Sequence, residues 1–532
     1  MIRISQIKLP PEHTGQDLLQ RAGKLLKVSP DQIKELHIIK KSIDARKKPE
    51  LFFVYTIDVL VEKEEKVLAR CRDKNVTTAK KKHYQIPDAP VNVSGRRPVI
   101  IGAGPAGLFA AYLLAQCHLC PIVIERGKKV EERTKDVHAF WETGVLNQAS
   151  NVQFGEGGAG TFSDGKLNTL VKDPLGRNQY VLDTFVKFGA PEKISYENKP
   201  HIGTDVLSDV IANMRNEITR LGGTFRFETC LTDLKTEGGV LTAVEVNHTE
   251  WIKTDCCVLA LGHSARDTFA WLHELGIPME PKAFAVGFRV EHPQSVINHT
   301  QYGAVYADSL EAAPYKVTAN LANGRGVYSF CMCPGGYVVN ASSEEAMLAV
   351  NGMSYSDRGS SNANSAIIVS VTPEDFDGTD ALAGVRFQRE LESRAYALGA
   401  GRIPQQLFAD YCTDSLSTSY GEFSSETRGA HTFANLRGLL PEEMEHSFIE
   451  GMHAFARQIP DFDRPDAILS GVESRTSSPV RICRNENFQS EIQGLYPCGE
   501  GAGYAGGITS AAMDGLKVAE AILKHYTAFD NR

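Results

Sequence analysis

Three glycines near residue 100 have the spacing to bind a phosphate group. Gly102, Gly104 and Gly107 directly follow the apolar segment 99–101. In a turn from strand to helix, the first glycine permits the tight turn, the second lets backbone N–H groups approach a pyrophosphate, and the third lets helix and strand pack closely. Glu125, 23 residues after Gly102, can accept hydrogen bonds from ribose hydroxyls. The pattern predicts a βαβ unit that binds a dinucleotide. Further contacts are expected from Pro105, Ala106 and Arg126.

A second glycine-rich turn lies near the end of the sequence. An apolar segment ends at Gly499-Glu500, and glycines then lead into a helical pattern. A nicotinamide dinucleotide needs only the first turn, whereas FAD also carries a ribityl chain and a reducible ring. Glu500 is placed to accept hydrogen bonds from ribityl hydroxyls, and the helix start can face the ring. The two turns together predict FAD. The expected contacts here are Gly499, Glu500, Gly506, Gly507 and Ile508.

The loop from Gly155 to Gly165 has five glycines in eleven residues and is followed by Lys166. Backbone amides of such a loop, Gly157 and Gly158 among them, can stabilise the negative charge of a reduced flavin near N1. Lys166 would add a cation near the ring, as a cofactor contact and a candidate catalytic residue. The alternative is a mobile loop with a solvated lysine.

Two more side chains are candidates for catalysis. The planar guanidinium group of Arg475 can bind a carboxylate or phosphate of the substrate through two hydrogen bonds. The alternative is a structural role, in which Arg475 joins two domains. His263 follows Gly262, at the end of an apolar segment where ligands approach an open α/β sheet. It is either a proton donor or a residue that caps or packs. Gly262 itself is a predicted cofactor contact.

Cys331 and Cys333 are the cysteine pair that most suggests redox or metal chemistry. Alternation on a strand places both on one face, but a disulfide across Cys-x-Cys is strained. A metal would need further ligands, and no neighbouring motif supplies them. We therefore predict no metal site, and we keep a redox role as the alternative. The eleven cysteines show no regular framework, which favours reduced thiols in a cytosol.

Composition and charge bound the class of protein. The 532 residues are 42% hydrophobic and 23% charged, which excludes a mostly disordered chain and predicts several domains. Residues 1–95 hold 19 Lys and Arg against 12 Asp and Glu, a net charge of +7. The rest of the chain holds 38 Lys and Arg against 53 Asp and Glu, a net charge of −15. Segment 98–124 has no charged residue, but its glycines indicate a strand, a turn and a buried helix rather than a membrane span. We predict a soluble cytoplasmic protein without stable membrane insertion.

The expected fold class is α/β, with a discontinuous Rossmann-like FAD-binding domain, an inserted mixed α+β substrate domain and a small basic N-terminal domain of βαββ type. In that small domain, lysines 40–48 are expected in a loop between two strands, and residues 224–255 are expected to form a three-stranded meander. The predicted divisions are 1–92 for the N-terminal domain, 93–282 and 461–532 for the FAD domain, and 283–460 for the substrate domain.

The ordered glycine motifs resemble the flavoproteins with a glutathione-reductase-like FAD domain. In that superfamily the C-terminal motif is usually Gly-Asp, and here Gly499-Glu500 keeps the carboxylate. The segment 257–262 looks like the superfamily's middle strand. Segments 153–169, 329–336, 473–481 and 495–507 also resemble a bacterial family known only as uncharacterised FAD-dependent dehydrogenases, distantly related to geranylgeranyl-reductase-like enzymes. The resemblance implies this fold and FAD, and it brings no substrate.

From these observations we predict an FAD-dependent oxidoreductase that transfers a hydride through flavin N5 to or from a small substrate, anionic or isoprenoid-like. No second G-x-G-x-x-G in a βαβ context is present, so we expect NAD(P)H to bind at most transiently. Two alternatives stay open: a flavin-dependent RNA-modifying protein, favoured by the basic N-terminal region, and a non-catalytic flavin-binding regulator. Basic runs are usually solvated faces, so we do not expect a nucleic-acid partner.

Overall fold

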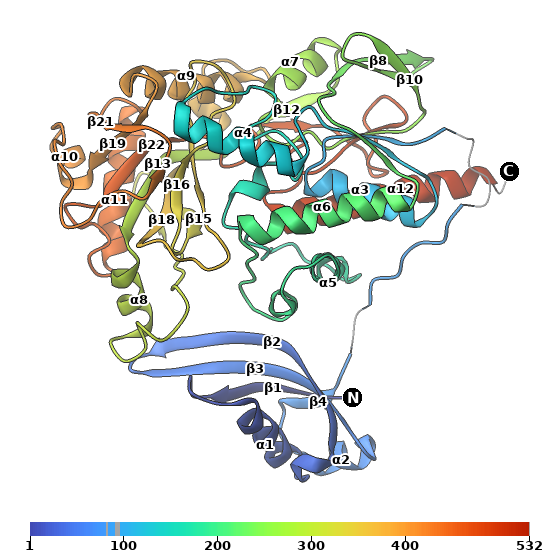
Figure 1. Ribbon diagram of the computed structural model, residues 1–532, viewed down its shortest axis with the longest axis vertical. Coiled ribbons are helices and arrows are strands. Elements are labelled where there is room, and N and C mark those ends of the chain that lie inside the picture. The colour runs from blue at the N-terminus through green and yellow to red at the C-terminus, as the bar shows by residue number, and fades with distance from the viewer. Residues whose placement is uncertain (81–82, 91–95, 531–532) are drawn as a thin grey trace.

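The computed structural model describes residues 1–80, 83–90 and 96–530. Figure 1 shows a small sheet at the N-terminal end of the chain, set below a larger body that contains a parallel sheet and a mixed sheet. Two of the three lysines at 80–82, and the predicted domain boundary between 92 and 93, lie outside the described residues.

The N-terminal sheet has four strands in the order β2-β3-β1-β4. Its elements are β1 (Ile2–Leu9), α1 (Gly15–Leu26), the 3-10 turn η1 (Pro30–Gln32), β2 (Ile33–Lys47), β3 (Glu50–Val61), α2 (Glu64–Arg70) and β4 (Val76–Thr78). Alternate side chains of β1, Ile2 and Ile4, pack with Leu18 and Leu26 of the amphipathic helix α1 in one core. The sheet thus adds a helix and a fourth strand to the expected βαββ order.

The structure corrects the predicted basic loop in this domain. Lysines 40, 41 and 47 lie within β2, which stays paired with β3 as far as Lys47 opposite Glu50. Exposed lysines suit an edge strand because their charge discourages pairing with another chain. The outer edge of β2 does contact the body: the Lys41 N–H donates to the Tyr196 carbonyl at 2.8 Å, and the Asn198 N–H donates to the Lys41 carbonyl at 2.9 Å.

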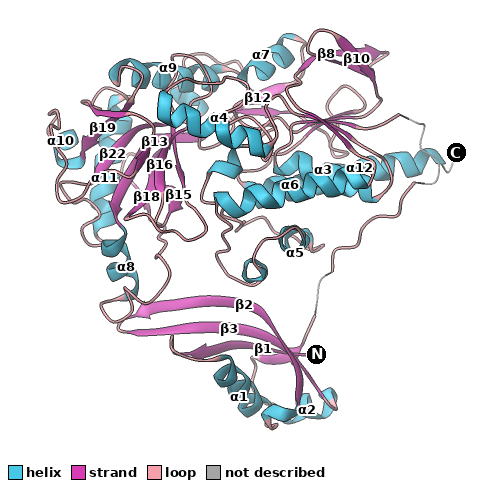
Figure 2. Cartoon of the chain, in the orientation of Figure 1, coloured by secondary structure: helices cyan, strands magenta, loops and turns pink. Residues whose placement is uncertain are grey.

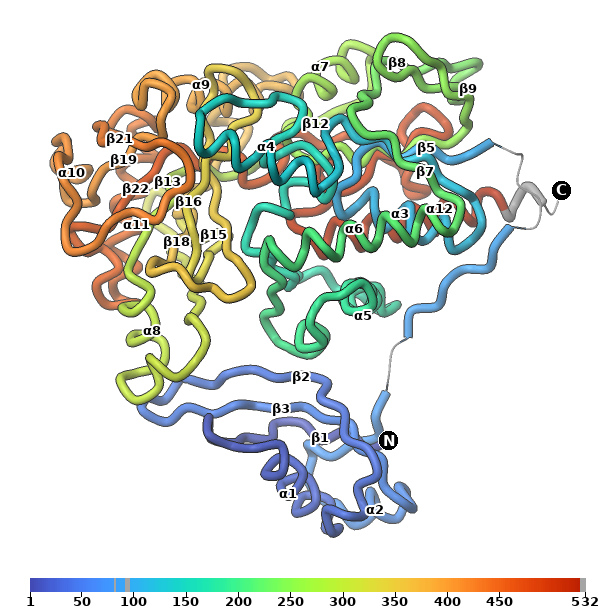
Figure 3. The backbone as a smooth tube through the Cα atoms, in the orientation of Figure 1, coloured from blue at the N-terminus to red at the C-terminus, as the bar shows by residue number. Residues whose placement is uncertain are grey.

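The parallel sheet has the order β24-β11-β5-β6-β7 and combines strands from both ends of the body. Its strands are β5 (Val99–Ile101), β6 (Ile122–Ile124), β7 (Thr224–Arg226), β11 (Cys257–Leu259) and β24 (Leu495–Pro497). The surrounding helices are α3 (Pro105–Gln116), α4 (Val130–Thr143), α5 (Arg177–Lys187), α6 (Thr204–Arg220), α7 (Arg266–Glu274) and α12 (Ile508–Asp530). In Figure 3 the tubes of α3 and α12 lie side by side, although they are far apart in sequence.

The uncharged segment 98–124 forms a strand, a glycine turn and a buried helix, as predicted. Along the described chain, no helix combines the length and the apolar character needed to cross a membrane. The meander is shorter than expected, because β7 joins the parallel sheet. Its three strands are β8 (Leu231–Glu237), β9 (Val240–Val246) and β10 (Glu250–Lys253).

The mixed sheet has seven strands in the order β14-β15-β18-β13-β22-β19-β21. Figure 2 draws its strands, β13 and β18 among them, in magenta. They are β13 (Phe284–Pro293), β14 (Thr318–Asn320), β15 (Gly326–Cys333), β18 (Asn362–Val371), β19 (Ile403–Leu407), β21 (His431–Phe433) and β22 (Ile468–Glu473). Because β22 pairs with β13, this sheet extends past residue 460, where the sequence had suggested its end.

Smaller elements complete this part of the molecule. The short strands are β12 (Met279–Pro281), β16 (Tyr337–Asn340), β17 (Val350–Met353), β20 (Thr427–Arg428) and β23 (Val480–Ile482). The helices are α8 (Gln294–Tyr302), α9 (Ala383–Leu398), α10 (Phe408–Cys412) and α11 (Glu442–Ala456). Buried residues of β13, β18 and α11, with Phe288 and Phe448 in edge-to-face contact at 5.1 Å, form a second core separate from that of the parallel sheet.

Candidate cofactor and substrate cavity

A cavity of about 460 Å³ lies between the parallel sheet and the mixed sheet. It runs past both glycine-rich turns and reaches the wall formed by β15. Most of the predicted cofactor contacts line it: Gly102, Gly104, Pro105, Ala106, Glu125, Arg126, Gly158, Lys166, Gly262, Glu500, Gly506, Gly507 and Ile508. Residues from opposite ends of the chain thus meet at one cavity.

The three glycines of the first turn have different surroundings. Gly102 has φ of +103°, and a Cβ there would lie 2.3 Å from the Ala260 carbonyl oxygen. A Cβ on Gly107 would lie 1.9 Å from the Gly102 oxygen, so Gly107 permits close packing and does not line the cavity. A Cβ on Gly104 would meet only Gly158, at 3.7 Å, and would stand in the cavity itself.

Glu125 is buried at the end of β6, on the cavity wall. Its carboxylate accepts hydrogen bonds from the backbone N–H groups of Ala103 and Gly127 at 2.9 Å and of Gly155 at 3.0 Å. These bonds fix the carboxylate beside the glycine turn. The next residue, Arg126, pairs with Asp267 at 3.0 Å, so its charge is engaged at the rim of the cavity.

The second turn differs from the first. A Cβ on Gly506 or Gly507 would meet no atom within 4 Å, and Gly507 has φ of +143°. Space for a ligand therefore lies directly in front of the first turn of α12. Gly499 does not line the cavity. Its N–H donates to Asp514 at 2.8 Å, and a Cβ there would lie 2.7 Å from that of Ala106, so Gly499 lets the two turns approach each other.

The side chain of Arg133 holds the glycine-rich loop in place, a role that the sequence did not indicate. This side chain is fully buried and donates to five backbone carbonyls, three in the loop and two just before it. The carbonyls belong to Asn151, Val152, Gly155, Glu156 and Gly158. The structure therefore shows an anchored loop. Gly157 faces inward, because a Cβ there would lie 2.1 Å from Thr161 Oγ1.

Lys166 follows this loop and lines the cavity. Its Nζ lies 3.2 Å from Asp164, a fully buried carboxylate that Arg358 also approaches at 3.2 Å. Burial opposes ionisation of Asp164, but the charges of Lys166 and Arg358 outweigh it and lower the pKa. The Thr509 hydroxyl donates to the Leu167 carbonyl at 2.7 Å, which holds this segment against the first turn of α12.

Titratable groups gather where the two sheets face each other. His263 Nδ1 lies 3.2 Å from Glu500, and its Nε2 is buried without a hydrogen-bond partner. Glu473, at the end of β22, is buried on the cavity wall and pairs with Arg289 at 3.0 Å. Burial raises the pKa of Glu473 to about 6. Glu473 is thus a group that can hold a proton close to neutral pH. The imidazole of His263 lies on the wall of the same cavity.

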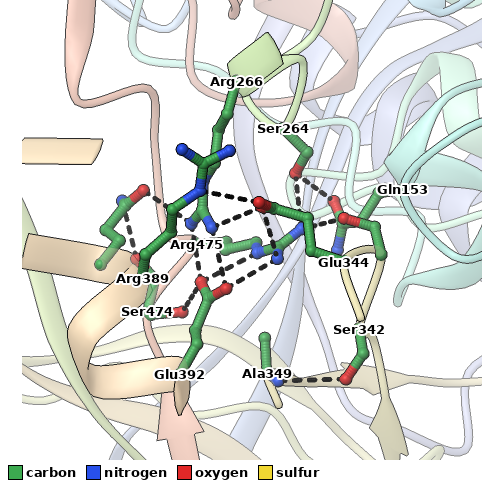
Figure 4. Close-up of polar contacts among 12 residues, drawn as sticks. Gln153, Ser264, Arg266, Ser342, Glu344, Ala349, Arg389, Glu392, Ser474 and Arg475 are labelled. Atoms are coloured by element: carbon green, nitrogen blue, oxygen red, sulfur yellow. Dashed lines mark hydrogen bonds and ion pairs between the residues drawn. The ribbon is translucent and has the colours of Figure 1, made fainter. Parts of the chain in front are cut away.

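Arg475 does not present a free fork to a substrate. Its Nη2 and Nε donate to the Glu392 carboxylate at 2.7 and 3.0 Å, and its Nη1 donates to the hydroxyls of Ser343 and Ser264. Arg266 binds the same carboxylate at 2.7 and 2.8 Å (Figure 4). Because its donors are engaged, Arg475 joins helix α9 of the mixed-sheet part to the segment before α7. The geometry supports the structural role of Arg475 between the domains. It does not support the predicted binding of a substrate anion by this side chain.

Cys331 and Cys333 lie at the end of β15, where only Cys331 lines the cavity. Cys331 has φ of +42°, and its carbonyl accepts from Arg289 at 2.7 Å. A hydrogen bond from Cys333, with the charges of Lys166 and Arg289, lowers the pKa of Cys331, while burial raises that of Cys333. Among the described residues, no group of three His, Cys, Asp or Glu side chains is arranged to hold a metal ion.

The cavity fits FAD by its own geometry. At Gly104, Gly506 and Gly507 a side chain would occupy the space where a ligand backbone must pass. Two helix starts, with unpaired N–H groups, border this space, and anions bind well at such positions. Carboxylates of Glu125 and Glu500 lie beside each turn as acceptors for hydroxyl groups.

Comparisons with known proteins agree with this geometry. Residues 283–476 match the family described as FAD-dependent protein, C-terminal domain-like, and residues 1–60 match a domain of unknown function (DUF8436). Over 530 residues the chain is 46% identical to an uncharacterized protein of Clostridium beijerinckii, and 99% of each chain is covered.

Solved structures with limited similarity include two amino-acid-oxidising enzymes. Glycine oxidase from Bacillus cereus is 12% identical, with a TM-score of 0.31, over 81% of this chain and 95% of that chain. L-proline dehydrogenase from P. horikoshii is 14% identical, with a TM-score of 0.33, over 84% of this chain and 99% of that chain.

The family match over residues 283–476 supports a flavoprotein and the predicted FAD. The chain belongs to the same family as the Clostridium beijerinckii protein.

Proposed function

We propose that this protein transfers a hydride between FAD and a small substrate bound against the mixed sheet. When bound, FAD supplies a ring that stores two electrons and exchanges a hydride at N5. The observation that carries the proposal is the single cavity that continues from both glycine turns to the wall of β15. The space beyond the turns is where a second molecule would meet the ring. Small anionic and isoprenoid-like compounds are the candidate substrates.

The chain's own residues have distinct roles in this proposal. Glu125 would accept hydrogen bonds from the ribose, and the α3 start at Gly104 would face the pyrophosphate. Glu500 would accept from the ribityl chain, and the amides of Gly507 and Ile508 would face the pyrimidine edge of the ring. These amides are backbone donors, so they can stabilise negative charge without reorganising.

Glu473 and His263 would hold or release the proton that accompanies the hydride. Both line the cavity, and each is held by a charged partner, Arg289 and Glu500 respectively. The charge of Arg289 fixes the orientation of the Glu473 carboxylate. Burial raises the pKa of Glu473 to about 6, so this group changes protonation close to neutral pH.

The proposal is tested on the purified holoprotein under anaerobic conditions. FAD content is measured first, and the protein is then mixed with NADH or NADPH while the absorption of oxidised flavin is followed. Bleaching by either nucleotide supports a reductase. If neither bleaches it, flavin reduced with dithionite is mixed with enones and quinones, and reoxidation by one of them supports the proposal. A flavin that exchanges electrons with none of these contradicts it and favours the regulator, and a protein that cannot take up FAD contradicts the cofactor site.

A further inference from the structure

Four cationic side chains line the part of the cavity that lies beyond the second glycine turn. They are Lys166, Lys199, Lys316 and Arg358, and we call them the cationic wall. They come from four separate segments: the end of the glycine-rich loop, the approach to α6, the approach to β14 and the loop after β17. Folding therefore assembles this charge from distant parts of the chain, at the place where a substrate would meet the ring.

The cationic wall is only partly neutralised. Asp164 is fully buried and pairs with both Lys166 and Arg358 at 3.2 Å. Among the described residues, neither Lys199 nor Lys316 forms an ion pair with a carboxylate. Four positive charges thus face one negative charge at this end of the cavity.

One other group near the wall can add negative charge: a hydrogen bond from Cys333 and the charges of Lys166 and Arg289 lower the pKa of the Cys331 thiol. Burial lowers the pKa of His201, which lies 3.6 Å from Asp164, and so favours its neutral form. Glu473 lines the cavity and pairs with Arg289, and Glu500 lines it 3.2 Å from His263. Glu197 and Glu311 lie near Arg358 without lining the cavity, and Glu311 pairs with Lys193 at 3.1 Å.

Unused donors in the wall point to a ligand. The Nε of Arg358 is buried without a hydrogen-bond acceptor, and the buried Nζ of Lys166 has only its ion pair with Asp164. Burial and the nearby charges of Lys166 and Lys316 lower the pKa of Lys199. A buried donor left without an acceptor is destabilising, and gathering like charges adds to that destabilisation. An oxyanion would supply acceptors and negative charge together.

We infer that the cationic wall is the anion subsite of the substrate, which binds a carboxylate or phosphate group and directs the rest of the molecule toward the flavin ring. This inference rests on the proposed function. Its position follows from the bond of Thr509 to the Leu167 carbonyl at 2.7 Å, which places the Lys166 end of the wall beside the first turn of α12. The anion could belong to a carboxylate substrate or to the phosphates of NADPH, and the test separates these sources.

The test begins with the holoprotein at low ionic strength, because added salt screens such charges. The flavin spectrum is titrated with succinate, with inorganic pyrophosphate, and with NADPH compared with NADH. A spectral change that saturates with any oxyanion supports the subsite. Saturation by succinate indicates a carboxylate source, and a preference for NADPH over NADH, with pyrophosphate competing, indicates a phosphate source. A flavin spectrum that none of these ligands perturbs overturns the inference.

The double substitution Lys199→Ala with Lys316→Ala locates the effect. Neither side chain belongs to a hydrophobic core, so the packed cores stay intact. We expect about tenfold weaker oxyanion binding, which is about 1.4 kcal/mol, at unchanged FAD content, because two cationic donors are removed from the wall. The matched control is Lys235→Ala with Lys253→Ala on the meander, which removes the same charge away from the cavity. Equal weakening in both variants, or none in the first, overturns the inference. If the protein without substitutions does not bind FAD, the proposed function is refuted instead.

Discussion

Replacing Glu392 by alanine tests whether the arginine network holds the two parts of the body together. Glu392 is 0% exposed and is the shared partner of Arg266 and Arg475, whose guanidinium donors lie 2.7–3.0 Å from its oxygens. Removing it leaves two buried positive charges with only Glu344 nearby. Breaking a buried ion pair in this way costs about 3–5 kcal/mol. We therefore expect Glu392→Ala to lower the free energy of unfolding by about that amount.

The assay is urea unfolding followed by tryptophan fluorescence. Trp271 lies on α7, the helix that begins at Arg266. The matched control is Glu390→Ala on the same helix α9, because Glu390 makes an exposed i,i+4 pair with Arg394. Such a pair contributes less than about 1 kcal/mol. If Glu392→Ala loses no more stability than Glu390→Ala, the network does not join the two parts and our reasoning is refuted.

The same network predicts the pH dependence. Burial alone would raise the pKa of Glu392, but the charges of Arg266 and Arg475 outweigh it and hold the pKa well below its usual value. A carboxyl whose pKa is depressed in the folded state stabilises the fold above its unfolded pKa of about 4.3, and this contribution is lost as the pH falls further. As the pH falls below about 4.3, we expect the free energy of unfolding to decrease more in the wild-type protein than in Glu392→Gln.

Two further predictions concern the cavity. We expect Gly104→Ala to lose FAD binding, and we expect its apoprotein to melt at the same temperature as the control Gly15→Ala. Gly107→Ala should instead destabilise the apoprotein by about 1–3 kcal/mol, because its Cβ would lie 1.9 Å from a backbone oxygen. Equal melting temperatures of Gly104→Ala and Gly107→Ala would contradict this prediction. Iodoacetamide should label Cys331 at lower pH than the exposed Cys412, because hydrogen bonding and nearby cations lower the pKa of Cys331. Mass spectrometry that finds Cys412 labelled first would contradict that assignment.

The cofactor turns could be predicted from sequence because their constraints are local. Gly102 needs a positive φ and Gly107 a missing side chain, and both needs arise within one strand–turn–helix unit. Glu125 directly follows β6, and Glu500 lies three residues after the end of β24, so a few neighbouring residues set the position of each at the sheet edge. The direct ligand contacts of these residues remain predictions.

The rest of the site depends on partners that are distant in sequence. Arg475 binds Glu392, 83 residues earlier, and a lone arginine beside hydroxyls gives no sign of such a partner. Arg133 lies in a helix with many charged residues, where burial of one arginine under a loop leaves no periodic signal. The lysines of β2 suggested a loop because strand propensity scales disfavour lysine, yet an edge strand tolerates it.

The order of strands in the parallel sheet also sets when the protein can acquire its cofactor. Strand β5 begins at residue 99, but its sheet is completed by β24 and its cavity by α12, which begins at residue 508. At a synthesis rate of about 5–20 residues per second, roughly 400 residues take about 20–80 s. The N-terminal sheet, complete by residue 78, can fold on the ribosome during this interval. Capture of FAD is therefore a late event, which follows synthesis of nearly the whole chain.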